Sequence, residues 1–316
     1  MSLAPPTIRV AAIDCGTNSI RLLVADVDPG SGRLVDVDRR MEIVRLGEGI
    51  DRSGEFSPAA LARTFAACDR YAAVIGQHEA ARVRFVATSA SRDARNRDEF
   101  AAGVRARLGV DPEVISGQEE AALSFDGVTR ELAGLATPYL VVDVGGGSSE
   151  FVLGTDGVEA AASVDMGCVR MTERHFHHDP PLPEEIEAAR ADVDALLDEV
   201  AARVPLAGAQ TMVALAGTAT TLAALALELP EYDPARIHLA RVPASDLGAV
   251  TTQLLGMTHA ERAALPALHP GRVDVIAAGA LVLERAVART RVGEVVISEH
   301  DILDGIAFSL APPALS

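Results

Sequence analysis

Apolar residues occur along this chain in two alternating patterns. Short apolar runs, typical of buried β-strands, lie at residues 8–14, 20–27, 83–90, 112–116, 139–144, 149–154 and 294–298. Between these runs, apolar side chains recur every three to four positions, which is the period of an amphipathic helix. Strands that alternate with helices predict an α/β protein.

Two of the predicted helices carry recognisable start signals. The pattern at residues 57–77 begins with Ser57 as a candidate N-cap. In the pattern at residues 96–109, Asn96 precedes Glu99 with the spacing of a capping box. Further helices are predicted at residues 183–204, 245–257 and 272–290.

Length and charge narrow the class of protein. The chain has 316 residues, enough for about two domains of roughly 150 residues each. Its net charge of -17 argues against nonspecific binding to a nucleic acid polymer or to anionic lipid. No apolar run is long enough to span a bilayer and no signal peptide is evident, so we expect a soluble, cytoplasmic protein with no membrane partner. Three distant cysteines predict neither a disulfide framework nor a zinc site.

One short pattern occurs twice. The stretches VAAIDCGTNSIRLLVA and YLVVDVGGGSSEFVLG each run from an apolar strand through an aspartate and a turn of small residues into a second strand. Aligning Asp14 with Asp143 also aligns Gly16 with Gly145. We therefore predict one hairpin in each half of the chain, with the two tips facing each other across a cleft.

The small residues of these tips suit phosphate. Glycine permits a positive φ and a close approach of backbone N–H groups to an anion. The candidate phosphate ligands at the tips are Asn18, Ser19, Gly145, Gly146, Gly147 and Ser148. An aspartate beside phosphate needs a bridging cation, so we predict that Asp14, Asp143 and Glu150 hold Mg²⁺. The alternative is a plain hairpin turn with Asp143 as a turn residue, which the duplication disfavours.

A third stretch, MVALAGTATTLAAL, combines a strand with a helix. The strand is expected to end at residues 216–218 and the helix to start directly afterwards. A helix N-terminus there would bind an anion through Gly217 and Thr218. The alternative is an ordinary helix cap by Thr218.

Seven motifs occur in order across nearly the whole chain: DCGTNSIRLLVADV, VATSASRDARN, VISGQEEAALSFDGV, VVDVGGGSSEFVLG, MGCVRMTERHF, ALAGTATTLAAL and SEHDILDGIAFSLA. Together they resemble the exopolyphosphatase and guanosine pentaphosphate phosphohydrolase family, within the acetate kinase, sugar kinase and actin-like ATPase superfamily. The resemblance implies two ribonuclease H-like domains with the active site between them. It also makes a homodimer plausible. Longer members continue into a C-terminal helical domain, whereas this sequence stops soon after its last motif.

The resemblance also predicts the domain boundaries. The last motif is expected to return to the first domain, which then comprises residues 1–124 and 298–316. The second domain comprises residues 125–297.

Two adjacent glutamates are expected to differ in role. Ser116 and Glu119 have capping-box spacing, so Glu119 is expected to reach back to the Ser116 amide. Glu120 points about 100° away around the helix. The resemblance assigns the general base to Glu120, and without it a solvated glutamate would be the better interpretation.

Basic residues must offset the charge of a phosphorylated substrate. Arg21 and Arg92 match basic positions of the family motifs and are predicted phosphate contacts. His175, His177 and His178 lie by a Pro-rich turn without a spaced partner, so we expect a structural or surface role.

These features predict a Mg²⁺-dependent hydrolase that releases terminal orthophosphate from inorganic polyphosphate. One alternative is release of the 5′-terminal phosphate of guanosine pentaphosphate (pppGpp), which uses the same chemistry. A second alternative is an actin-like nucleotide-binding module or kinase. The glutamate pair on a capped helix favours a hydrolase.

Overall fold

The computed structural model describes residues 7–311, which fall into two compact units. The first unit comprises Met1–Val128 and Ile302–Ser316, and the second comprises Thr129–Asp301. The chain thus leaves the first unit once and returns to it near its end. The boundaries predicted from the sequence were 124 and 298, and the two ends of the predicted first domain, 1–6 and 312–316, lie outside the described residues.

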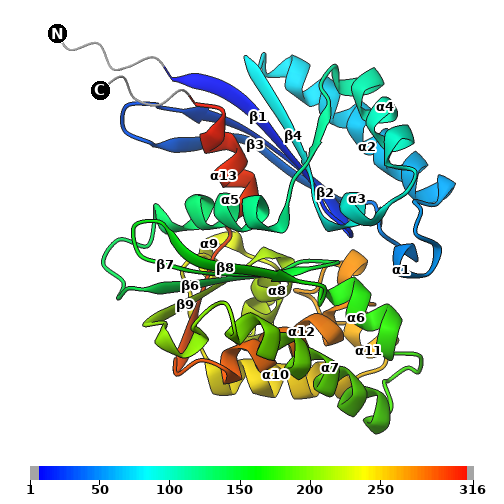
Figure 1. Cartoon of the computed structure of the whole chain (residues 1–316), viewed down its shortest axis with the longest axis vertical. Helices are drawn as coiled ribbons and strands as arrows, with labels where there is room; N and C mark the ends of the chain where they lie inside the picture. Colours follow the sequence, from blue (N-terminus) through cyan, green and yellow to red (C-terminus); the bar gives the residue numbers. More distant parts are fainter. Residues whose placement is uncertain (1–6, 312–316) are drawn as a thin grey trace. The chain divides into compact units, whose positions relative to one another are not determined.

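The first unit contains a five-stranded sheet with the order β3-β2-β1-β4-β5 (Figure 1). Its strands are β1 (Ile8–Cys15), β2 (Ser19–Val27), β3 (Leu34–Ile43), β4 (Arg82–Ala87) and β5 (Pro112–Val114). β1, β2 and β3 are antiparallel neighbours, whereas β4 pairs with β1 in parallel, as does β5 with β4. The sheet therefore combines an antiparallel meander with parallel crossover strands.

Helices cover both faces of this first sheet. The helices are α1 (Ile50–Ser53), α2 (Pro58–Gln77), α3 (Ser89–Asp93), α4 (Arg97–Leu108), α5 (Gly117–Thr129) and α13 (Ile302–Ser309). Ala11 and Ile13 of β1 pack in one core with residues of α2 and α4, and Val10 and Ala12 pack in another with residues of α13. Within this unit, Figure 1 shows α2 and α4 together on one side of the sheet and α13, in red, on the other. Strand alternation thus gives the sheet two buried faces.

The second unit repeats the plan. Its strands are β6 (Tyr139–Val144), β7 (Ser149–Gly154), β8 (Val158–Val164), β9 (Thr211–Leu215), β10 (Arg241–Pro243) and β11 (Glu294–Ile297), in the order β10-β11-β9-β6-β7-β8. The series β8-β7-β6-β9 has the same directions as β3-β2-β1-β4 of the first sheet. The predicted repetition of one hairpin unit is therefore confirmed.

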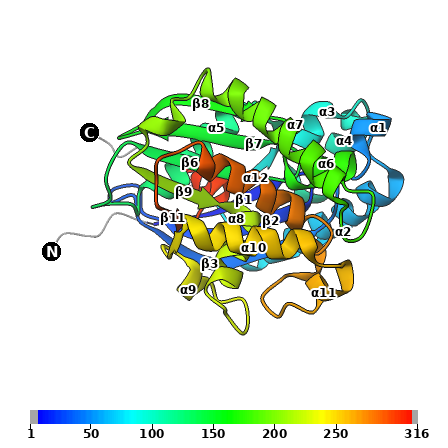
Figure 2. The same ribbon diagram turned by 90° about the horizontal axis from the view of Figure 1, so that it is seen from below.

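One large core fills the second unit. Its helices are α6 (Cys168–His175), α7 (Pro183–Ala201), α8 (Ala216–Ala226), α9 (Pro234–Ile237), α10 (Ala244–Gly256), α11 (His259–Ala263) and α12 (Ile276–Ala288). α12 is buried on nearly every side and packs against α7 and α10, which flank it in Figure 2. Apolar side chains of these helices join alternate residues of β6, β7 and β9 in the core.

Sequence patterns missed three strands, and each is an edge strand. β3, β8 and β10 end the two sheets and carry polar or exposed residues. Edge strands tolerate charges because one side of the strand faces no neighbour, so their apolar alternation is weak. Among the described residues, no helix is both long and apolar enough to cross a membrane.

The two predicted helix starts had different outcomes. Ser57 caps α2, since its Oγ accepts from the Ala60 N–H at 3.1 Å. The capping box at Asn96 was wrong, because the Asn96 side chain instead binds the backbone N–H and carbonyl of Phe56 at 2.8 and 3.0 Å. The Asn96 side chain therefore binds backbone that is distant in the sequence and not the N–H groups at the start of its own helix.

Candidate active site: two matched hairpins

The two hairpins place charged residues at equivalent positions. Asp14 lies directly opposite Arg21 in the β1–β2 pair. Asp143 lies directly opposite Glu150 in the β6–β7 pair. The first hairpin therefore pairs an acidic residue with a basic one, whereas the second hairpin pairs two acidic residues.

In the first unit, Asp14 is neutralised by its cross-strand neighbour. Arg21 donates to Asp14 Oδ2 through Nη2 at 2.6 Å and through Nε at 3.0 Å. The Asp14 side chain is almost fully buried. A charge-assisted, two-point contact of this kind fixes both side chains at the turn.

Glu120 is the other buried carboxylate of this unit. Only 8% of its surface is exposed, and Arg92 donates to its Oε2 at 2.8 Å. The same guanidinium nitrogen donates to the Ile115 carbonyl at 3.1 Å. Burial raises the pKa of Glu120 to about 7, because the opposing effect of Arg92 is smaller and the charge of Asp14 adds to the rise. A carboxyl with this pKa can accept a proton near neutral pH.

Glu119 has a different environment, although its predicted contact was only half right. The Glu119 N–H donates to Ser116 Oγ at 3.2 Å, so the serine caps α5. The Glu119 side chain does not form the other half of the box, because it pairs with Arg84 at 2.9 Å. It is 46% exposed. The two adjacent glutamates are therefore separated by burial, as the helix geometry predicts.

In the first unit, the turn after Asp14 directs its carbonyl groups to neighbouring backbone. The Thr17 carbonyl accepts from the Gly47 N–H at 2.9 Å, and the Asn18 carbonyl accepts from the Val44 N–H at 3.0 Å. In a trans peptide the C=O and the following N–H point in opposite directions. The amides of Asn18 and Ser19 therefore point away from these partners.

The glycine turn of the second unit uses the same device. The carbonyl groups of Gly145, Gly146 and Gly147 all accept from backbone amides at the start of α6. The donors are the N–H groups of Cys168 at 2.8 Å, Val169 at 2.9 Å and Gly167 at 3.0 Å, in that order. The amides of residues 146–148 consequently point away from α6, which is the arrangement of an anion-binding nest.

The glycine turn of the second unit is closely packed, and its first glycine has no unusual φ. Gly16 and Gly145 both lie outside the left-handed region. A Cβ on Gly145 would lie 3.0 Å from the Ser148 carbonyl oxygen. A Cβ on Gly167 would overlap the backbone of Gly146. The turn and the start of α6 are in contact through bare backbone.

In the second unit, buried carboxylates line the hairpin that carries this turn. Asp143 and Glu150 face each other across the strands, and both are almost fully buried. Glu150 Oε1 accepts hydrogen bonds from Ser148 Oγ and Ser163 Oγ, each at 2.7 Å. An all-oxygen set that carries negative charge fits a hard divalent cation such as Mg²⁺.

The third predicted motif differs from expectation at the helix start. α8 begins at Ala216, so Gly217 and Thr218 lie inside its first turn. Thr218 does not act as the cap, because its hydroxyl donates to the Val144 carbonyl at 3.3 Å and residue 215 is the N-cap. Ala216 has a φ of 63°, a strained value for a residue with a Cβ. Such strain is often stored at functional sites.

Arg272 is a residue that sequence reasoning missed. Its guanidinium occupies the space where a Cβ on Gly217 would lie. Its positive charge also lowers the pKa of Cys168, although burial of that thiol has the larger effect and raises the pKa to about 11. No local signal marks Arg272, since it is brought to α8 from the segment before α12.

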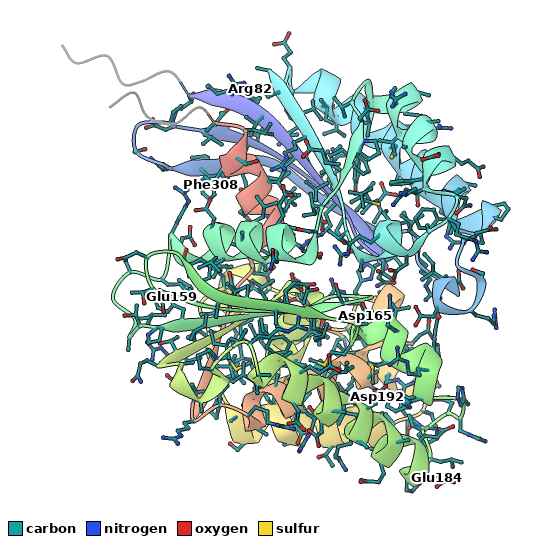
Figure 3. All side chains as sticks on the ribbon, in the orientation of Figure 1. Arg82, Glu159, Asp165, Glu184, Asp192 and Phe308 are labelled. Atoms are coloured by element: carbon teal, nitrogen blue, oxygen red, sulfur yellow. The ribbon has the colours of Figure 1, made fainter. Side chains whose placement is uncertain are left out.

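Ion pairs hold α6 in place. Arg170 pairs with Asp165 at 3.5 Å, and Arg174 pairs with Asp192 of α7 at 2.8 Å; both carboxylates are labelled in Figure 3. His175 also contacts Asp192 at 2.8 Å. The helix that supports the glycine turn is therefore anchored by its own side chains.

His177 and His178 contact Glu185 at the start of α7. The His177 backbone N–H lies 3.1 Å from Glu185 Oε1, and His178 Nδ1 lies 2.8 Å from the same oxygen. These contacts agree with the structural or surface role expected for this histidine segment.

Two α/β units with matched acid-bearing hairpins define a protein with the fold of the actin-like ATPase superfamily. The chain belongs to the Ppx/GppA phosphatase family, whose sequence profile matches residues 23–314. This membership confirms the resemblance seen in the seven motifs.

Individual relatives cover nearly the whole chain. Exopolyphosphatase 2 of Mycobacterium tuberculosis is 53% identical over 314 residues, which is 96% of this chain and 98% of that protein. The crystal structure of an exopolyphosphatase-like protein matches with a TM-score of 0.92 at 43% identity, covering 96% of this chain and 98% of the other. An Aquifex aeolicus member of the Ppx/GppA family matches with a TM-score of 0.81 at 29% identity, covering 96% and 97%. The predicted fold class is thereby confirmed.

Proposed function

We propose that the protein is an exopolyphosphatase, which hydrolyses the terminal phosphoanhydride of inorganic polyphosphate and releases orthophosphate. The observation that carries the proposal is Glu120, a buried carboxyl with a pKa of about 7 beside Arg92. The name of the Mycobacterium tuberculosis relative, Exopolyphosphatase 2, supports this choice of substrate. A buried proton acceptor is what a hydrolase needs and a passive nucleotide-binding module does not.

Glu120 acts as the general base in this proposal. It takes one proton from a water whose oxygen attacks the terminal phosphorus. The bond from that phosphorus to the bridging oxygen breaks, and the shortened polyphosphate keeps this oxygen. Arg92 orients the carboxylate through its 2.8 Å contact and offsets its charge.

In each unit, the turn offers backbone amides to phosphate groups. In each of these peptides the carbonyl accepts a hydrogen bond from neighbouring backbone. The N–H groups of residues 18–19 and 146–148 therefore point to the opposite side. Arg21 supplies a positive charge at the first turn. The second unit adds two groups that favour an anion. These are the N-terminal turn of α8, which contains Gly217 and Thr218, and the guanidinium of Arg272 beside it.

A divalent cation, Mg²⁺ in this proposal, would neutralise phosphate oxygens while it is bound to Asp143 and Glu150. These two carboxylates are paired across β6 and β7 and offer oxygen ligands alone. Asp14 is a further candidate, although its carboxylate holds Arg21 in this structure. The proposal therefore assigns the cation first to the second unit's hairpin.

A second candidate substrate is pppGpp, which carries the same terminal linkage and is supported by the family description. The proposal also includes a cytoplasmic location. The absence of a nucleic acid or membrane partner is supported by the net charge of -17. The proposal includes a homodimer as well, which is supported by the family resemblance alone.

The deciding experiment compares orthophosphate release from medium-chain polyphosphate, pppGpp and ATP, each with Mg²⁺ and with EDTA. We expect polyphosphate to be the best substrate and EDTA to stop the reaction. Faster release from pppGpp would reassign the substrate. Release from ATP alone would favour the actin-like nucleotide-binding alternative.

A further inference from the structure

Away from the matched hairpins, Glu131, His238 and His300 form a compact cluster within the second unit. His238 Nε2 lies 2.8 Å from Glu131 Oε2, and His300 Nδ1 lies 3.0 Å from the same oxygen. The two imidazole rings have centroids 4.7 Å apart. Among the described residues, this is the one group of histidine, cysteine or acidic side chains with metal-binding spacing.

The backbone holds two members of the cluster together. His238 directly follows α9, and His300 lies shortly after β11. The Leu239 N–H donates to the Ile297 carbonyl at 2.7 Å, and the Ile297 N–H donates to the Ala240 carbonyl at 2.9 Å. The segment that carries His238 is therefore tied to the end of β11, so the two rings are brought close by main-chain hydrogen bonds.

The spacing of the ligand atoms suits a tetrahedral ion. Ligands at about 2.0–2.1 Å from zinc lie about 3.3 Å from one another. The distances from Glu131 Oε2 to the two imidazole nitrogens, 2.8 and 3.0 Å, need to widen by only a few tenths of an ångström, and all three ligand atoms lie within 4.8 Å of one another. The side chains are 44%, 24% and 29% exposed for Glu131, His238 and His300, so solvent has access to a fourth position.

We propose that Glu131, His238 and His300 bind a divalent transition-metal ion, with zinc as the best fit. Two imidazoles and one carboxylate are a common zinc ligand set, and imidazole is a poor match for Mg²⁺. This site is distinct from the oxygen-lined hairpin of Asp143 and Glu150. It does not rest on the proposed phosphatase activity.

Binding has a definable cost in protons and hydrogen bonds. The Glu299 N–H donates to His238 Nδ1 at 3.3 Å, so in the neutral ring Nε2 carries the proton that Glu131 accepts. Zinc at Nε2 requires this proton to leave and Nδ1 to become the protonated nitrogen, which breaks the 3.3 Å bond.

The positions of the ligands in the chain give the site a structural consequence. Glu131 lies just after the point where the chain enters the second unit, and His300 lies just before the point where it leaves. A zinc ion bound to both residues and to His238 cross-links the entering and leaving segments. Such a link stabilises the second unit at the two points where the chain enters and leaves it.

The test is calorimetric titration of the full chain with Zn²⁺ at pH 7.5 in the presence of excess Mg²⁺. We expect one site with a micromolar or tighter Kd, at least about tenfold weaker in His238→Ala and in His300→Ala. His259→Ala is the matched control, because His259 pairs with Asp274 in another part of the same unit at 3.1 Å. It should leave the affinity unchanged.

Thermal melting of the same variants without metal checks that each is folded. Zn²⁺ should raise the Tm of the wild type and of His259→Ala, and leave that of His238→Ala and His300→Ala unchanged. Absence of saturable binding to the wild type would overturn the proposal. Equal affinity in the wild type and in both cluster variants would overturn it too, by placing the ion elsewhere.

Discussion

Two neighbouring residues, Glu119 and Glu120, provide the sharpest test of the proposed chemistry. Glu120→Gln keeps the shape of the side chain but cannot accept a proton, so phosphate release should fall by about 10² to 10⁴. Glu119→Gln is the matched control. Glu119 is half exposed in an ion pair with Arg84, so its loss should cost less than about 1 kcal/mol and leave turnover unchanged. Equal losses of activity in the two variants would show that Glu120 is not the general base.

The pKa of Glu120 also predicts how stability depends on pH. This pKa is about 7 in the folded chain against an ordinary value of 4.5, so the folded state holds the proton longer than the unfolded state. The stability that the neutral carboxyl contributes is complete below pH 4.5 and is lost as the pH rises to about 7. Between pH 5 and 8 the wild type should lose on the order of 2 kcal/mol more than Glu120→Gln in urea unfolding. Parallel pH profiles would contradict this.

Activity should rise with pH, whereas the stability contributed by Glu120 falls. A general base acts when it is deprotonated, so kcat/KM should rise as the pH increases through about 7 and then level off. The measurement is a pH series of polyphosphate turnover at saturating Mg²⁺. A rate that is constant from pH 5.5 to 8.5 would show that Glu120 does not titrate in the reaction.

Asp143 tests the cation at the scale of a single ligand. Asp143→Asn replaces a carboxylate by a neutral amide, a poorer ligand for a hard cation. The Mg²⁺ concentration for half-maximal rate should rise at least about tenfold, equivalent to about 1.4 kcal/mol. Asp156→Asn, in the exposed turn after β7, is the control. An unchanged Mg²⁺ dependence for Asp143→Asn would return Asp143 to the status of a turn residue.

At the scale of elements, the sequence revealed the paired hairpins but not what supports them. Asp14 and Asp143 could be aligned because each is the next-to-last residue of a largely apolar strand. The amides at the start of α6 that hold the glycine turn could not be predicted, since they are about twenty residues further along and the contact is made by backbone alone. Arg272 was missed because its side chain reaches Gly217 from a segment that is distant in the sequence. Local patterns specify strands and turns, whereas long-range contacts depend on packing.

The contact between the glycine turn and α6 gives a prediction for the element pair. In Gly167→Ala the new methyl group would overlap the backbone of Gly146 and Gly147, so the turn must shift. Because its amides are proposed to bind phosphate, turnover should fall together with the Tm. Gly157→Ala is the control, since a Cβ there has no neighbour within 4 Å. Normal turnover per folded molecule of Gly167→Ala would separate the turn from phosphate binding.

At the scale of the whole molecule, the sequence predicted the α/β class and the repeat, and it missed features that depend on distant pairs. Glu131 and His238 are 107 positions apart and have no motif in common. The missed strands β3, β8 and β10 all lie at sheet edges, where burial imposes little pattern. What the sequence encodes most plainly is the fully buried centre of each sheet, where both faces demand apolar residues.

Each unit has an apolar core of its own, which leads to a prediction about unfolding. Units that are stabilised separately need not unfold in one step, so calorimetry should give a total enthalpy larger than the van't Hoff value. Leu22→Ala removes a fully buried side chain of β2, and Leu283→Ala removes one of α12. Each should cost about 2–5 kcal/mol. If the cores act separately, Leu22→Ala lowers the transition of the first unit alone and Leu283→Ala that of the second, whereas equal shifts of a single transition in both variants would show that the chain unfolds as one cooperative body.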